Sequence, residues 1–147
     1  MIQLNNEILD SFAEINRAIY KLIKKDADRA GITVVQLKAL YFISLHQEVG
    51  LGELADKLKL TNSTVSGVID RLVQQELVER LVPPENRRSV SIKLTDKGEA
   101  ILKELFSNHS ILVNRIKQVM DLPKEEINHL LRLHKLILSV LITEEEK

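Results

Sequence analysis

Two short segments joined by a tight turn, and followed by two alternating apolar runs, constrain the fold of this chain most strongly. Each short segment carries apolar residues at helical spacing, so each predicts a helix that is buried along one side. The apolar residues of the first are Leu51, Leu54, Ala55 and Leu58, and those of the second are Val65, Val68, Ile69, Leu72 and Val73. Residues 60–61 form the junction, and Thr61 or Asn62 can cap the second helix.

The alternating runs, residues 78–82 and 90–94, are rich in β-branched side chains and predict the two strands of a hairpin. Pro83 and Pro84 end the first strand, because neither can donate a hydrogen bond to a ladder. From Asn86 to Lys93 the hairpin carries three basic residues, Arg87, Arg88 and Lys93, and no acidic one. Two helices, a tight turn and a hairpin are the components of a winged helix-turn-helix. We therefore expect a mostly α fold with a small β-hairpin (α+β).

Further helices are predicted before and after this region. Residues 7–29 form an amphipathic helix, and Thr33 with Gln36 gives a capping box that opens another. Thr95 is expected to cap one long helix whose apolar residues continue to Val119. Pro123 then breaks the pattern and starts a last helix.

The end helices carry more apolar surface than a winged core can cover, and residues 127–141 are apolar nearly all round. Because exposed apolar faces promote aggregation, we expect them to be buried in a homodimer. The alternative is that these helices pack on their own chain. The expected organisation is a single domain of residues 1–147. In it, residues 33–98 form the winged helix-turn-helix, and residues 1–30 and 99–147 form a helical dimerisation region.

Composition narrows the class of protein without naming a partner. Lys plus Arg equals Asp plus Glu, 21 against 21, so only the local placement of charge can support nucleic-acid binding. The absence of cysteine excludes disulfides and thiolate metal sites. The chain begins without a signal-peptide pattern and has no apolar run approaching the roughly 20 residues of a membrane span. We expect a soluble, cytoplasmic protein with no membrane partner.

The second short helix has a polar side that suits a DNA major groove. Opposite its apolar stripe, or at the edges of that side, lie Ser63, Thr64, Ser66, Gly67, Asp70, Arg71 and Gln74. Small polar residues near a helix N-terminus let the backbone approach the bases, and their hydroxyls can bond base edges or phosphates. An arginine at the tip of the hairpin can enter a narrow minor groove. The alternative for both features is an ordinary solvated surface.

These motifs together resemble the MarR family of bacterial transcription regulators over nearly the whole chain. Residues 86–95 read N-x-R-x-x-x-I-x-L-T and are followed by Gly98, which is similar to the family's wing signature D-x-R-x-x-x-V-x-L-T. Residues 68–80, VIDRLVQQELVER, are similar to its recognition helix running into the first wing strand. The departure is Asn86, where the family has an aspartate that can pair with the wing arginine. We hypothesise that Asp70 bonds a wing arginine instead.

The resemblance implies an obligate homodimer that binds a pseudo-palindromic double-stranded DNA operator, most often as a repressor. It implies that Arg88 enters the minor groove, and that Arg71 and Arg87 lie at backbone phosphates. The expected DNA-binding residues are Thr61, Asn62, Ser63, Thr64, Ser66, Gly67, Arg71, Arg87 and Arg88. An alternative use of a winged helix is protein–protein contact, in which the arginine pair docks on an acidic surface.

Relatives often respond to small aromatic ligands at the junction of the dimerisation region and the winged core. A small apolar or aromatic effector would there contact Ile15, Ile19, Tyr41, Leu45 and Phe106. Packing in the core is the alternative role for these side chains.

Catalysis, cofactors and metals are not expected from the sequence. His129 and His134 are five residues apart, which sets them on different faces of a helix. No Gly-rich phosphate loop, convergent carboxylate pair or serine–histidine arrangement is present. The chain is therefore expected not to be an enzyme.

Overall fold

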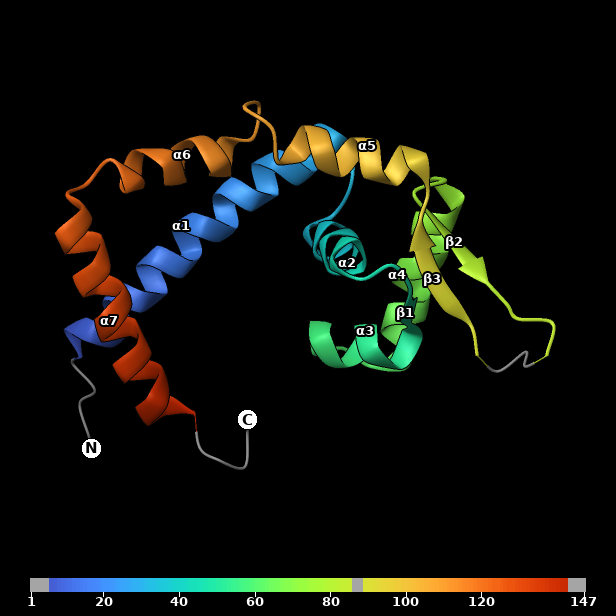
Figure 1. The fold of residues 1–147 in the computed structure, drawn as a ribbon, viewed down its shortest axis with the longest axis horizontal. Helices are drawn as coiled ribbons and strands as arrows, with labels where there is room; N and C mark the ends of the chain where they lie inside the picture. Colours follow the sequence, from blue (N-terminus) through green and yellow to red (C-terminus); the bar gives the residue numbers. More distant parts are fainter. Residues whose placement is uncertain (1–5, 86–88, 143–147) are drawn as a thin grey trace. The chain divides into compact units, whose positions relative to one another are not determined.

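The computed structural model describes residues 6–85 and 89–142. Contacts within the chain define two compact units, Met1–Leu112 and Val113–Lys147. The first holds α1 (Glu7–Ala30), α2 (Val34–Leu45), β1 (Val49–Gly50), α3 (Leu51–Leu58), α4 (Asn62–Gln74), β2 (Val78–Leu81), β3 (Ser91–Leu94), α5 (Asp96–Leu105) and the start of α6 (Ile111–Met120). The second holds the rest of α6 and α7 (Lys124–Leu141). The mostly helical fold with a small β-sheet is as predicted (Figure 1).

Local capping signals set the helix boundaries of the first unit. The capping box of α2 is present: the Gln36 amide donates to Thr33 Oγ1 at 3.1 Å, and the Thr33 amide donates to Gln36 Oε1 at 2.9 Å. Thr61, and not Asn62, caps α4 by accepting the Thr64 amide at 3.2 Å. Gly31 ends α1 in the left-handed region at φ 72°, where a residue with a side chain would be strained.

The sheet has one strand more than the predicted hairpin. β2 and β3 pair antiparallel with Val78 opposite Leu94 and Arg80 opposite Ile92. β1 adds to the other edge of β3 and gives the order β1-β3-β2. A strand of two residues carries no periodicity of its own, so the sequence did not indicate it. Figure 1 shows the sheet beside α4, at the start of α5.

The prediction of one long helix from Thr95 to Val119 is wrong, because the structure forms α5 and α6 with residues 106–110 between them. Ser107 donates two hydrogen bonds to the backbone oxygen of Glu104, one from its amide at 3.1 Å and one from its hydroxyl at 2.5 Å. Serine and asparagine side chains compete in this way with helical hydrogen bonds. The apolar residues of α5 and α6 keep the same helical spacing across residues 106–110, so the sequence pattern did not indicate the break.

The core of the first unit lies where α2, α3 and α4 meet the sheet and α5. Its largest fully buried side chains are Leu40, Ile43, Leu54, Ile69, Leu72, Leu77, Ile92, Val49 and Val65. The start of α5 packs close to this core, since a Cβ added to Gly98 would lie 2.1 Å from the carbonyl oxygen of Leu77. Only glycine fits at that position without a backbone shift.

In α6 and α7 no residue is buried. Pro123 stands at the N-cap of α7, just before the first helical turn in which it was expected. The largest exposed apolar side chains from Ile116 onward are Ile116, Val119, Met120, Leu122, Leu130, Leu131, Leu133, Leu136, Leu138, Val140, Leu141 and Ile142. These helices therefore present apolar surface that no described residue covers.

Candidate nucleic-acid interface

The outward face of α4 follows from the burial of its opposite side. Val65, Ile69 and Leu72 are fully buried against the core. Because of the helical repeat, the predicted DNA-binding residues of α4 then lie on its solvent-facing side. Thr61, Asn62, Ser63, Thr64, Gly67 and Arg71 are exposed, and Ser66 is half-buried. The structure thus brings seven of the nine predicted DNA-binding residues onto one helix and its cap.

The N-terminal turn of α4 is ordered by its own hydroxyls. The Oγ1 atoms of Thr61 and Thr64 lie 2.9 Å apart, and Thr61 Oγ1 also accepts the Thr64 amide. Further along, nothing lies within 4 Å of a Cβ built on Gly67, so the backbone is open there. This turn can approach a flat or grooved partner closely while offering hydroxyl donors and acceptors.

Arg71 is available for an anion. Within the described part of the chain, its guanidinium makes no hydrogen bond or ion pair. It stands between two hollows, of about 230 and 490 Å³, that it lines together with Thr33 and Gln36 of α2. Thr64, Gly67 and Val68 complete the smaller hollow. A free arginine in an open polar hollow is the arrangement that suits a backbone phosphate.

Asp70 makes an ion pair with Arg80 of β2. The pair joins the outward face of α4 to the first strand of the hairpin. The hypothesis was that Asp70 bonds a wing arginine, and the arginine that it bonds is Arg80, in the first strand of the wing. The single buried side-chain atom without a partner in the described residues is Oε1 of Gln75, just after α4.

The hairpin tip itself lies outside the described residues. Asn86, Arg87 and Arg88 fall there, so their predicted roles stay predictions. The described part of the hairpin is anchored at its base, where Val78, Ile92 and Leu94 are buried. Lys93 is exposed on β3. The two strands that lead to the tip are thus fixed to the core beside α4.

The predicted effector residues are only partly brought together. The rings of Tyr41 and Phe106 pack with their centroids 5.3 Å apart. Phe106 and Leu45 line a hollow of about 750 Å³ whose rim carries Lys93 and Glu99. Ile15 and Ile19 of α1 do not line this hollow.

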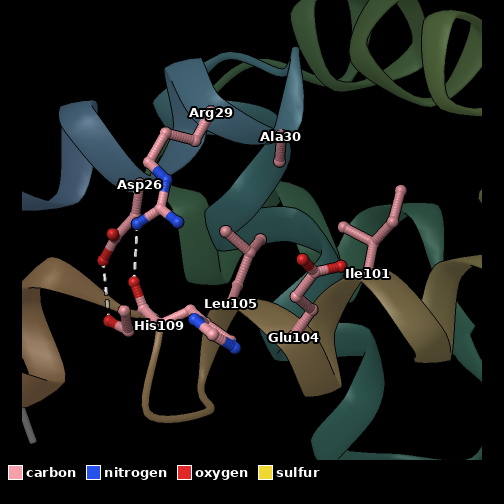
Figure 2. Close-up of a pocket in the computed structure, with 8 residues that line it drawn as sticks. Asp26, Arg29, Ala30, Ile101, Glu104, Leu105 and His109 are labelled. Atoms are coloured by element: carbon pink, nitrogen blue, oxygen red, sulfur yellow. Dashed lines mark hydrogen bonds between the residues drawn. The ribbon is translucent and has the colours of Figure 1, made fainter.

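A separate hollow of about 290 Å³, which sequence reasoning missed, lies between the end of α1 and the α5–α6 segment. Figure 2 shows Asp26 and Arg29 of α1 reaching that segment. Arg29 donates to the carbonyl oxygen of His109 at 2.6 Å, and Asp26 accepts the hydroxyl of Ser110 at 2.7 Å. Partners that lie 80 and 84 residues apart leave no local signal in a sequence.

Two helices joined by a tight turn, a sheet with an extended hairpin, and a polar outward face on the second helix define a winged helix-turn-helix protein. Comparison with known protein families supports this class, because the sequence model of the MarR family matches residues 32–90. This chain belongs to the MarR family of transcriptional regulators.

Individual relatives support this assignment. The chain is 32% identical to the HTH-type transcriptional regulator YsmB of Bacillus subtilis (strain 168), over 71% of this chain and 76% of that protein. It is 31% identical to the organic hydroperoxide resistance transcriptional regulator of the same organism, over 70% and 69% of the two chains.

Solved structures are similar over more of the chain. The apo form of wild-type MarR from E. coli is 25% identical, with a TM-score of 0.72 over 90% of this chain and 98% of that one. A MepR variant from S. aureus bound to an oligodeoxyribonucleotide has the same fold, with a TM-score of 0.63 at 22% identity over 94% and 100%. In the described residues, no helix is long and apolar enough to cross a membrane.

Proposed function

We propose that this protein is a transcriptional repressor that binds a pseudo-palindromic DNA operator as a homodimer. The observation that carries the proposal is the outward face of α4. This face combines an open backbone at Gly67, exposed hydroxyls at the N-terminal turn and an arginine, Arg71, with no partner among the described residues.

In this account α4 lies in the major groove. Ser63, Thr64, Ser66 and Gly67 approach the base edges, while Thr61 and Asn62 lie at the adjoining backbone. Arg71 binds a phosphate next to the hollow that it shares with Thr33. Arg87 and Arg88 at the tip of the hairpin contact the backbone and the minor groove. Residues 33–98 are thereby the DNA-binding region.

The homodimer forms through residues 1–30 and 99–147. Support comes from the apolar side chains that α1, α6 and α7 leave exposed, among them Ile8, Ile15 and Leu131. Exposed apolar surface of this extent on a monomer favours association. A two-fold dimer would hold the two copies of α4 about one turn of DNA apart, roughly 34 Å.

An effector site is proposed at the hollow lined by Leu45 and Phe106. Its wall combines the exposed Phe106 ring with Leu45, and its lysines are matched by Glu48 and Glu99, so it suits a small aromatic or apolar molecule. We further propose that the protein acts in the cytoplasm, as a regulator and not as an enzyme.

Selection from a pool of random-sequence duplexes tests the proposal. The purified protein is incubated with the pool at low salt, and bound duplexes are sequenced after several rounds. The proposal predicts enrichment of two inverted half-sites whose centres are separated by about 10 base pairs. Recovery of unenriched sequences would overturn it, and would favour an acidic protein surface as the partner of the arginine pair.

A further inference from the structure

The ion pair between Asp70 and Arg80 lies where the recognition helix meets the wing. Side chains alternate between the two faces of a strand, so Val78 and Arg80 of β2 point the same way. Val78 is buried, and so is Ile92, which stands opposite Arg80 on β3. Arg80 therefore lies on the inward face of the sheet, where the buried apolar residue Val78 is followed on the same side of the strand by a charged one.

Beyond Val78 the residues of β2 are less buried. Glu79 and Arg80 are exposed, and Leu81 is half-buried. Asp70 is the described partner that reaches Arg80 from α4. Pairing with β3 and the buried base anchor the strand, and the Asp70–Arg80 pair adds a direct link from α4 to the part of β2 that lies beyond the base.

A large role in stability does not explain the pair. The side chains are 35% exposed for Arg80 and 58% exposed for Asp70, and exposed ion pairs contribute little to folding. Breaking the pair has a larger effect on the charge beside the proposed DNA-binding residues of α4 than on the stability of the fold. An unpaired Arg80 would bind phosphates of any sequence, and an unpaired Asp70 would repel them.

We propose that Asp70 is a specificity-determining residue that acts through Arg80. It holds β2 in a fixed direction relative to α4, so that helix and hairpin fit one operator together. It also keeps Arg80 from serving as an indiscriminate phosphate contact. The inference rests on the proposed DNA-binding function and adds to it a device that separates operator from non-operator DNA.

The test compares the affinity for a duplex selected by the wild-type protein with that for a shuffled duplex of the same composition. In Asp70→Asn the pair loses its charge while the side chain keeps its size. The affinity for shuffled DNA should rise, and the ratio of the two affinities should fall by about tenfold. The dependence of shuffled-DNA binding on salt should steepen by about one phosphate contact, because Arg80 is released.

Two further variants separate positioning from simple charge. Asp70→Glu retains a carboxylate that can reach Arg80. Because the charge of the pair is kept, the affinity ratio of this variant should stay within about twofold of the wild-type ratio. Glu76→Gln is the matched control. It removes the same charge close to α4 and breaks a 4.0 Å contact with Lys97, but it does not touch β2. Its ratio should also be unchanged.

The inference is overturned if Asp70→Asn and Glu76→Gln change the affinity ratio equally, or if Asp70→Asn leaves the ratio unchanged. Melting temperatures of all variants are measured alongside, and they should differ little because the pair is exposed. A wild-type protein that binds both duplexes equally would overturn the proposed function itself, before any variant is compared.

Discussion

The carboxylate of Asp26 in α1 accepts a hydrogen bond of 2.7 Å from the hydroxyl of Ser110, a residue that follows it by 84 positions. The same carboxylate accepts the amides of Ile111 at 2.7 Å and Leu112 at 3.2 Å. Asp26 and Ser110 are both buried. One side chain therefore caps the start of α6 from a different helix and ties it to the end of α1.

Replacement of Asp26 by alanine should destabilise the protein, because it leaves three hydrogen-bond donors without their acceptor. We expect a loss of about 2–4 kcal/mol in the free energy of unfolding, measured by urea denaturation. Asp28→Ala, two residues further along α1, removes only an exposed ion pair with Lys24 and should cost less than about 1 kcal/mol. Equal losses in the two variants would show that the cap from α1 is unimportant.

Gly98 provides a second test of packing. In Gly98→Ala the new Cβ would lie 2.1 Å from the Leu77 carbonyl oxygen, so α5 and the start of β2 must move apart. We expect destabilisation of about 1–3 kcal/mol or more by thermal unfolding. Gly52→Ala in α3 meets nothing within 4 Å and should instead stabilise by about 0.5–1 kcal/mol. A neutral Gly98→Ala would contradict the close approach.

Much of the first unit could be predicted from sequence because its signals are local. The Thr33–Gln36 capping box, the Thr61 cap and the apolar stripe of α4 all lie within a few residues of the structure that they specify. The same is true of β2 and β3, whose alternation marks both strands. Family resemblance then supplied the expected roles of Arg71 and of the hairpin tip.

What could not be predicted depends on residues far apart in the chain. β1 exists only because β3 offers it an edge. The break between α5 and α6 is held by Asp26 and Arg29, which no spacing rule connects to residues 109–112. The Arg80 partner of Asp70 likewise follows from the side of the strand on which Arg80 lies.

Arg71→Ala should weaken binding to all DNA sequences alike. Loss of one phosphate contact reduces the slope of log affinity against log salt by about one, with little change in which sequence is preferred. Fluorescence anisotropy at several salt concentrations measures this slope. Arg132→Ala in α7 removes the same charge outside the proposed interface and should leave the slope unchanged. A change in preferred sequence would assign Arg71 to base contact instead.

The dimer can be tested on α7, where Leu131 and Leu138 lie seven residues apart on one face and are both about half exposed. Glutamate at both positions should give the mass of one chain by light scattering, since two buried charges per copy oppose association. His129→Glu lies toward the opposite face of the helix and should leave the mass of two chains. A monomeric wild type would contradict the proposed dimer.

Binding of a specific DNA sequence by α4 and the hairpin should involve several phosphates. It is tested most directly by the affinity of the wild-type protein for the selected duplex and for its shuffled counterpart, measured from about 50 to about 200 mM salt. We expect a preference for the selected duplex at every salt concentration, together with a steep loss of affinity for both duplexes as the salt concentration rises. Equal affinity for the two duplexes, or affinity independent of salt, would contradict it.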